Sequence, residues 1–390
     1  MSETTLPRAA AAEAPSPQVC IFIPSFGDGG VEHMLVNAAR GMAALGARVD
    51  FIVNQADGPY LDRLPSAVRL LTLGSRDQRD LLAEFRKYLR ADRPAVVVSA
   101  KGRDDRIALK AKTTAPVGTR FFLRPGTAVT ARLEERGTSR LRRWLKYRRM
   151  RRLYAQADGV VAVSEGVADE IARSTRFPRE RIRVIRNPTI TPELPGLSEA
   201  PVSHPWFAPG ERPVILGVGG LRMQKDFATL IRAFARLRER RPARLMILGE
   251  GRQQARLQEL ARKLGVADDV RLPGFADNPY AYLRHAALFV LSSLWEGSPN
   301  VLTEALAIGT PVVSTDCRSG PREILQGGRF GPLVPVGDAE ALARAMVETL
   351  ENPLPAETLR EATSEYTMEK SARRYLDAFG IEPFGQPSPP

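Results

Sequence analysis

Short apolar runs recur along the first half of the chain, with amphipathic stretches between them. The runs are rich in Val, Ile and Phe and occupy residues 19–24, 49–53, 95–99, 120–123, 159–164 and 182–185. Runs of this kind are typical of strands buried on both faces of a parallel sheet. Between Val31 and Leu45, apolar residues recur three and four positions apart, which predicts a helix. Alternating strands and helices predict a parallel sheet with helices on both faces.

A proline-rich segment without apolar periodicity divides the chain and predicts an interdomain connection. Further apolar runs follow it at residues 214–219, 244–249, 288–292 and 311–314, and they predict a second sheet. We therefore expect an α/β protein with two Rossmann-like, doubly wound domains that face each other across a cleft. The expected parts are a disordered tail at 1–16, a first domain at 17–190, a linker at 191–212, a second domain at 213–365, and a final helix and tail at 366–390.

Positive charge is concentrated in the first half of the chain. Residues 1–200 hold 34 Lys and Arg against 22 Asp and Glu, whereas residues 201–390 hold 23 against 22. This asymmetry indicates that the first half faces an anionic partner, such as a nucleic acid, an acidic lipid surface or a phosphorylated molecule. The alternative is an arginine-rich surface that is simply solvated.

The densest positive charge lies in the segment 140–154, which has eight Lys or Arg among residues 140–152. Read as a helix, this segment places its apolar residues in two groups and not in one stripe. Such a helix can rest on an anionic membrane surface. The side chains expected to contact the membrane are Arg148, Arg149, Arg151 and Arg152. A helix whose arginines are merely solvated is the alternative.

The two cysteines and the N-terminal residues indicate in which cellular compartment the protein is expected. Cys20 and Cys317 are the only cysteines and lie in separate apolar segments, so no disulfide framework is expected. The first residues lack the basic start and the apolar run of a signal peptide. No apolar run approaches the roughly 20 residues that span a bilayer. We expect a cytoplasmic protein that can bind the membrane surface peripherally.

The segment 291–325 carries the most chemical information. Ser298 and Pro299 stand where a helix N-cap and a first helical residue are expected, and Gly309 stands where the helix should end. The first turn would present free N–H groups together with the positive end of the helix dipole. These are the N–H groups of Asn300, Val301 and Leu302. The sequence therefore predicts an anion site at this helix terminus.

Two glutamates flank the predicted anion site. Glu296 precedes the turn, and Glu304 lies eight positions later on the helix. Carboxylates suit sugar hydroxyls because each oxygen accepts hydrogen bonds from neighbouring OH groups. An ordinary capped helix with two solvated glutamates is an equally good interpretation of the spacing alone.

The sequence of this segment, EGSPNVLTEALAIGTPVVSTD, resembles that of the retaining glycosyltransferases of family 4, which have the GT-B fold. In that family two glutamates separated by seven residues mark the donor site, and Glu296, GSPNVLT and Glu304 match this pattern. The resemblance implies that Glu304 holds the ribose hydroxyls of a donor nucleotide and that Glu296 contacts the transferred sugar. It assigns the donor diphosphate to the loop residues Gly297, Ser298, Pro299, Asn300, Val301 and Leu302.

Three other segments resemble the same family, so that the likeness runs from about residue 18 to residue 380. Residues 24–46 look like its first glycine loop, in which Gly29 and Gly30 would let backbone approach the diphosphate or the acceptor. Residues 218–237 look like its segment with a diphosphate-neutralising lysine, here Lys225. Residues 270–293 look like its base-binding segment, which implies that Gly274 and Phe275 lie near the nucleobase.

Two positions depart from the family pattern. The family usually has an arginine where this chain has Gly220, and Arg222 is the candidate replacement at the diphosphate. The family often has a histidine near the donor sugar, where this chain offers Arg124. These departures bear on sugar preference and on whether the chain is active at all.

The resemblance implies an enzyme that moves a hexosyl group, with retention, from a nucleotide-sugar to a glycan or lipid-linked acceptor in surface polysaccharide assembly of the bacterial type. The acceptor would bind the first domain, the donor the second, and the final helix would return to the first domain. A UDP-sugar is the preferred donor. Glu296 and Lys225 would be the catalytic residues. No Asp-x-Asp cluster is present, and we expect neither a metal nor a cofactor.

Three other interpretations remain open from sequence. A nucleic-acid-binding protein would use the basic half, but residues 140–154 contain no recognised nucleic-acid motif. A nicotinamide-dependent enzyme should have G-x-G-x-x-G after a first strand, and this chain does not. A relative that binds a nucleotide-sugar without turning it over is the third.

Overall fold

Two parallel sheets organise the computed structural model, which describes residues 18–27, 29–58, 60–127 and 139–382. The first sheet has seven strands in the order β3-β2-β1-β4-β5-β6-β7. Its strands are β1 (Gln18–Phe22), β2 (Arg48–Val53), β3 (Val68–Thr72), β4 (Val96–Ser99), β5 (Arg120–Leu123), β6 (Gly159–Ala162) and β7 (Ile182–Val184). Its helices are α1 (Gly30–Ala44), α2 (Gln78–Asp92), α3 (Gly102–Ala111), α5 (Arg140–Tyr154) and α6 (Glu165–Thr175). The predicted tail at 1–16 lies outside the described residues.

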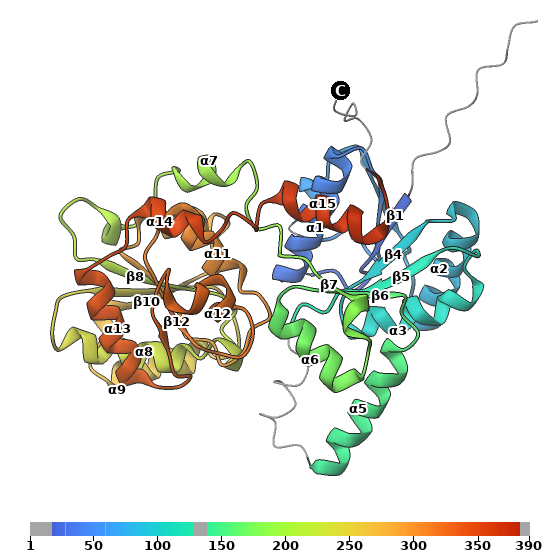
Figure 1. Cartoon of the computed structure of the whole chain (residues 1–390). Coiled ribbons are helices and arrows are strands. Elements are labelled where there is room, and N and C mark those ends of the chain that lie inside the picture. The colour runs from blue at the N-terminus through green and yellow to red at the C-terminus, as the bar shows by residue number, and fades with distance from the viewer. Residues whose placement is uncertain (1–17, 28, 59, 128–138, 383–390) are drawn as a thin grey trace, which may run out of the picture.

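The second sheet has six strands in the order β10-β9-β8-β11-β12-β13. Its strands are β8 (Val214–Val218), β9 (Arg244–Leu248), β10 (Val270–Gly274), β11 (Leu288–Leu291), β12 (Val312–Thr315) and β13 (Leu333–Val334). Its helices are α8 (Phe227–Arg238), α9 (Gln254–Lys263), α10 (Pro279–His285), α11 (Asn300–Ile308), α12 (Pro321–Ile324), α13 (Ala339–Glu351) and α14 (Ala356–Glu361). Figure 1 shows the two sheets side by side, each with helices on both faces. This arrangement confirms the predicted fold class.

Strand β1 shows why the apolar runs are continuous. Val19 and Ile21 belong to one buried cluster of the first sheet, while Cys20 and Phe22 belong to another. Successive side chains of a strand point to opposite faces, so a strand covered on both sides must be apolar at every position. Cys20 is buried in this way, and both cysteines are free, as the sequence predicts.

The chain crosses between the sheets twice. The first crossing includes α7 (Leu194–Ser198) and places the buried Trp206 against the core of the second sheet. The second crossing leads into α15 (Met368–Phe379), which begins where the Met368 N–H donates to the Ile190 carbonyl oxygen at 2.9 Å. Helix α15 packs on α1, and its Tyr375 and Phe379 belong to the core of the first sheet. The last helix thus lies on the first domain, as the red ribbon among blue elements in Figure 1 shows.

The strand order places ligand-facing loops in both sheets. In the first sheet the order reverses between β1 and β4, and in the second between β8 and β11. At such a reversal the loops that follow the two strands turn to opposite sides and leave a crevice at the carboxyl ends. The loops after β1, β4, β8 and β11 are therefore the ones expected to hold ligands.

Candidate functional site between the two domains

Helix α11 begins one residue later than the sequence predicts. Pro299 is the N-cap, with an extended backbone, and the helix runs from Asn300 to Ile308 before Gly309 ends it at a φ of 90°. The Leu302 N–H donates to the Pro299 carbonyl oxygen at 3.1 Å, so the expectation that this N–H is free is wrong. The anion site predicted at this terminus is therefore limited to the N–H groups of Asn300 and Val301.

Glu296 is buried and paired in the loop before α11. Only 5% of the residue is exposed. Its Oε1 lies 2.7 Å from the Lys225 Nζ and accepts from the Ser293 hydroxyl at 2.7 Å. The Gln224 amide donates to Oε2 at 3.5 Å. Lys225 belongs to the loop after β8, so this ion pair joins the two ligand-facing loops of the second domain.

Glu304 is buried on α11, with 6% of the residue exposed. Burial raises the pKa of Glu304 to about 7, while the charge of Lys225 and a hydrogen bond with Tyr280 act in the opposite direction. Both glutamates are therefore buried, which rules out the interpretation of two solvated side chains. The sequence did not reveal the part of Tyr280, which reaches Glu304 from α10.

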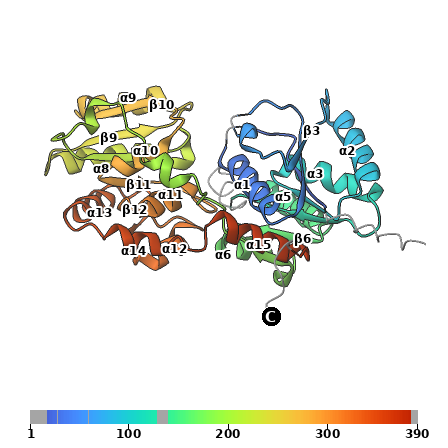
Figure 2. The same cartoon turned by 90° about the horizontal axis from the view of Figure 1, so that it is seen from above.

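The first domain contacts this site through its glycine loop. Gly29 is the N-cap of α1, and a Cβ at this position would lie 2.8 Å from Oε2 of the buried Glu32. The Asn300 side chain donates to the Gly30 carbonyl oxygen at 3.3 Å. The first turns of α1 and α11 therefore meet across the domain interface, as the arrangement in Figure 2 also indicates.

The loop before α11, which contains Gly297 and Ser298, also contacts a second segment of the first domain. A Cβ on Gly297 would lie 2.2 Å from the Gly126 carbonyl oxygen, so only glycine fits there. The Ser298 carbonyl oxygen accepts from the Asn187 side chain at 3.4 Å. The same Asn187 amide donates to Oδ1 of Asn300 at 2.7 Å. Gly297, Ser298 and Asn300 thus lie at the contact between the domains.

Arg124, which the resemblance places near the donor sugar, is held by hydrogen bonds inside the first domain, and its expected contact with the sugar stays a prediction. It is 1% exposed, and its guanidinium donates to the Tyr375 hydroxyl at 2.8 Å and to Oδ1 of Asn187 at 2.7 Å. Asn187 in turn donates a hydrogen bond to Asn300, so Arg124 is linked through Asn187 to the first residue of α11. The sequence predicted that the final helix returns to this domain, but not that its Tyr375 accepts a hydrogen bond from Arg124.

The Arg222 side chain lies close to Gly220, and its expected role at the diphosphate stays a prediction. A Cβ on Gly220 would meet the Arg222 Nε at 3.1 Å, so the side chain folds back over this glycine. Arg222 is otherwise exposed. The absence of a side chain at position 220 therefore leaves room for the guanidinium of Arg222 beside the Lys225 loop.

The two residues expected near the nucleobase, Gly274 and Phe275, lie at the carboxyl end of β10. Gly274 has a φ of 99°, and its carbonyl oxygen accepts from the Gly249 N–H at 2.7 Å. Phe275 is 56% exposed, and its N–H donates to Oε1 of Glu250 at 3.5 Å. An exposed aromatic ring at the carboxyl end of a strand can stack on a nucleobase.

The basic segment 140–154 is helix α5, and it carries both exposed apolar and exposed basic side chains. Leu141, Trp144 and Leu145 are exposed, and Arg148 lies over the Trp144 ring at 5.5 Å. Met150 and Tyr154 are buried nearer to the domain. Three of the four arginines expected at a membrane are exposed: Arg148, Arg149 and Arg152. Arg151 is half-buried instead, and its Nε donates to the Ser174 carbonyl oxygen of α6 at 3.3 Å.

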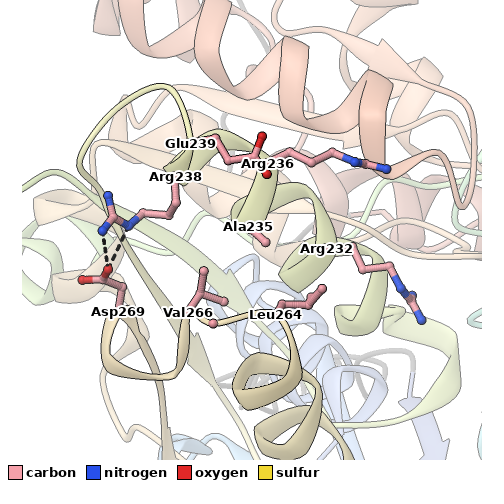
Figure 3. A pocket seen from close by; sticks show the side chains of 9 residues that line it. Arg232, Ala235, Arg236, Arg238, Glu239, Leu264, Val266 and Asp269 are labelled. Atoms are coloured by element: carbon pink, nitrogen blue, oxygen red, sulfur yellow. Dashed lines mark hydrogen bonds and ion pairs between the residues drawn. The ribbon is translucent and has the colours of Figure 1, made fainter.

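A pocket of about 450 Å³ lies elsewhere on the second domain. Ala235, Leu264 and Val266 contribute apolar surface, and Arg238 pairs with Asp269 at one side. Figure 3 shows Arg232 and Arg236 extending to the other side. The pocket is formed by the C-terminal half of α8, whereas Lys225 precedes the first residue of that helix. It is therefore separate from the Glu296–Lys225 pair.

In the part of the chain that the structure describes, no three His, Cys, Asp or Glu side chains gather so as to hold a metal ion. Among the helices described, none is both long enough and apolar enough to cross a bilayer.

Two family models match the chain. Residues 28–193 match the model described as Glycosyltransferase Family 4, and residues 202–370 match the model described as Glycosyl transferases group 1. Between them the matches take in most of both sheets. The chain belongs to the family 4 glycosyltransferases of the GT-B fold.

Curated relatives of this chain are themselves named as glycosyltransferases. The lipopolysaccharide core biosynthesis glycosyltransferase LpsE of Rhizobium meliloti is 32% identical over 235 residues, which cover 59% of this chain and 66% of the relative. The N-acetylgalactosamine-N,N'-diacetylbacillosaminyl-diphospho-undecaprenol 4-alpha-N-acetylgalactosaminyltransferase of Campylobacter jejuni is 31% identical over 231 residues, which cover 57% of this chain and 61% of the relative. The match thus spans less than two thirds of either relative.

Solved structures share the fold of this glycosyltransferase. The structure of Anabaena HepE in complex with UDP-glucose has a TM-score of 0.73 at 18% identity, and covers 93% of this chain and 99% of that chain. At this identity the likeness establishes the GT-B fold alone.

Proposed function

We propose that this chain is a retaining glycosyltransferase that transfers a hexosyl group from a UDP-sugar to a glycan or lipid-linked acceptor in surface polysaccharide assembly. The observation that carries the proposal is the arrangement around α11. Buried Glu296 pairs with Lys225, and buried Glu304 lies on the helix whose first turn meets the glycine loop of the other domain. A partly buried cation and two buried carboxylates close to a helix N-terminus match the chemistry of a nucleotide-sugar.

Each donor group has a candidate partner in this arrangement. Glu304 accepts hydrogen bonds from the ribose hydroxyls, and Phe275 stacks on the uracil ring with Gly274 beneath it. Lys225 and Arg222 neutralise the diphosphate, with the N–H groups of Asn300 and Val301 as further donors. Glu296 accepts from hydroxyls of the transferred sugar after the diphosphate has drawn Lys225 toward itself.

In the proposed reaction, the protein acts mainly by stabilising the negative charge of the departing diphosphate. The bond from the anomeric carbon to the diphosphate oxygen breaks, and the acceptor oxygen bonds to the same face of that carbon. The departing diphosphate oxygen takes the proton of the acceptor hydroxyl. Positioning by the two domains and stabilisation of the diphosphate by Lys225 supply the rate. We propose that no metal takes part.

The acceptor side of the proposal rests on the first domain. The Campylobacter relative is named for a diphospho-undecaprenol-linked acceptor, and α5 presents exposed basic and apolar side chains on the same helix. We propose that α5 brings the protein to the cytoplasmic face of a membrane, where a lipid-linked acceptor would be found.

The test is product analysis with a panel of UDP-, GDP- and dTDP-sugars, with bacterial lipid extract as acceptor and with EDTA present. The expected result is transfer from a UDP-sugar with the anomeric configuration of the donor retained in the product. Glu304→Ala should lose nucleotide binding. A product with inverted anomeric configuration would contradict the retaining mechanism. Transfer that stops in EDTA and returns with metal would contradict metal independence. Nucleotide binding without transfer to any acceptor would contradict the transferase activity.

A further inference from the structure

Three side chains of the first domain form a stack beside the start of α1. The His33 and Tyr60 rings are stacked with centroids 4.8 Å apart and planes 13° apart. The Arg63 guanidinium lies 5.4 Å from the centroid of the Tyr60 ring and donates to Nε2 of His33 at 3.4 Å. We call His33, Tyr60 and Arg63 the nucleoside-facing stack. None of these residues belongs to the site described above.

The stack occupies a ligand-facing position. His33 lies in the first turn of α1, whose Gly30 contacts Asn300 of the donor helix. Arg63 ends the short 3-10 helix Leu61–Arg63, which follows β2. Both segments follow strands at their carboxyl ends, where doubly wound domains bind ligands.

Arg63 of the stack interacts electrostatically with Tyr280 of the second domain. Tyr280 is buried beside Glu304, and burial raises its pKa above the ordinary value. Glu304 and Arg63 both interact electrostatically with this hydroxyl: the charge of Glu304 raises its pKa and that of Arg63 lowers it. Arg63 of the first domain is therefore close enough to Tyr280 of the second domain for electrostatic interaction across the interface.

The chemistry of the stack suits a nucleotide. The guanidinium of Arg63 is exposed and offers a planar set of donors, which matches phosphate and ribose oxygens. The ring beneath it restricts its motion, so less conformational freedom is lost on binding. Burial together with Arg63 and Arg40 lowers the pKa of His33 to about 4, so His33 is neutral near pH 7 and accepts from Arg63.

The geometry points to the nucleoside-facing stack as a second wall of the donor site: Arg63, held by Tyr60 and His33, donates to the ribose and the adjacent phosphate of the nucleotide. This inference rests on the proposed function. It assigns part of the donor's recognition to the domain that otherwise faces the acceptor, and it makes full nucleotide affinity depend on both domains together.

Calorimetry first identifies which of UDP, GDP, ADP and dTDP binds the full-length wild-type chain most tightly. The affinity for that nucleotide is then compared between the wild type and its variants. We expect Arg63→Met to weaken binding about tenfold, a typical loss for one charge-assisted hydrogen bond. The loss should be equal for the corresponding nucleotide-sugar, because the contact does not involve the sugar. Tyr60→Leu should weaken binding, and Tyr60→Phe should weaken it less because the ring is retained. Arg90→Met, on the outer helix α2, is the matched control and should bind as the wild type does.

The outcomes separate this inference from the function on which it rests. If Arg63→Met binds the nucleotide as tightly as wild type while Glu304→Ala does not bind it, the stack is no part of the donor site and the proposed function stands. If the loss appears in the KM for the acceptor and not in nucleotide affinity, the stack serves the acceptor and the inference is overturned. A wild-type protein that binds none of the nucleotides overturns both. Unchanged thermal unfolding of Arg63→Met shows that a loss of binding is not a loss of fold.

Discussion

At the scale of a single residue, the proposed role of Glu304 predicts that donor binding depends on pH. Burial raises the pKa of Glu304 to about 7, so below that pH the free protein holds a proton that ribose hydroxyls must displace. Donor affinity should therefore rise between pH 6 and 8, by at most about tenfold for each pH unit below the pKa. Calorimetry of UDP binding at several pH values measures this effect, and Glu304→Gln is the control that should flatten the profile. A wild-type profile as flat as that of the variant would contradict the role of this carboxyl.

Lys225 has two separable roles, because it neutralises buried Glu296 as well as the proposed diphosphate. Lys225→Met should lower the free energy of unfolding by about 3 kcal/mol, since breaking a buried pair leaves one charge without its partner. Lys225→Met with Glu296→Gln should recover most of that stability, because the remaining group is neutral. Neither variant should transfer sugar at a measurable fraction of the wild-type rate. Thermal unfolding and turnover are both measured, and recovery of turnover in the double variant would remove Lys225 from the reaction.

Sequence reasoning found the two glutamates from their spacing and Lys225 from the family resemblance, but it missed residues whose part in the site depends on tertiary contacts alone. Glu296 and Glu304 stand on one loop and helix, so their spacing was visible. Tyr280 and Asn187 were not visible, because their contacts depend on how α10 and the end of the first domain fold against α11. The Asn187–Asn300 hydrogen bond joins residues 113 positions apart. The Arg124–Tyr375 hydrogen bond was not visible for the same reason, since the two residues lie 251 positions apart.

At the scale of elements, the patterns predicted strands and helices closely because local chemistry fixes them. Buried strands need apolar residues on both faces, and α11 ends at Gly309 because glycine accepts the left-handed backbone. Helix α11 starts one residue later than predicted, because Pro299 has an extended backbone and takes the capping position. The predicted linker was read as irregular, yet it contains α7 and the buried Trp206, whose packing depends on the second domain.

Helix α5 should bind anionic membranes through charge. Eight basic residues within residues 140–152 should give an attraction that salt screens over a Debye length of about 8–10 Å. We expect the protein to sediment with vesicles of anionic lipid at low salt, to be released as salt rises, and not to bind neutral vesicles. Replacing Arg148, Arg149 and Arg152 with Gln should abolish this binding and leave nucleotide affinity unchanged.

The matched control for α5 removes the same number of charges from another exposed helix, as Arg79, Lys87 and Arg90→Gln on α2. Binding that falls equally in both variants would reflect net charge alone and would contradict a specific role for α5. Equal binding to neutral and anionic vesicles would mean that Trp144, Leu141 and Leu145 insert and outweigh charge. Either result would change the membrane part of the proposed function.

At the scale of the whole molecule, one carboxylate of the second domain caps a helix of the first. Glu323 on α12 accepts from the backbone N–H groups of Glu165 and Gly166 at 2.9 and 2.8 Å, and its Oε2 lies 2.6 Å from Arg186. A carboxylate at a helix N-terminus is stabilised by the free N–H groups and by the helix dipole. No sequence pattern predicts this contact, because the donors are backbone groups of a distant segment. The contact instead holds the first turn of α6 against the second domain.

Removing this cap should loosen the two domains while leaving each one folded. Glu323→Ala takes away three hydrogen-bonded contacts, and we expect an interaction of about 1–3 kcal/mol to be lost. Hydrogen exchange at the Glu165 and Gly166 amides should become faster, and the radius of gyration in solution should increase. Nucleotide affinity should fall as well, since Asn300 and Gly30 meet only when the domains are together. Asp316→Ala is the control, because it breaks the Asp316–Arg322 pair within the second domain. Exchange and radius unchanged in Glu323→Ala would mean that the contacts of Asn187 and α15 hold the domains without this cap.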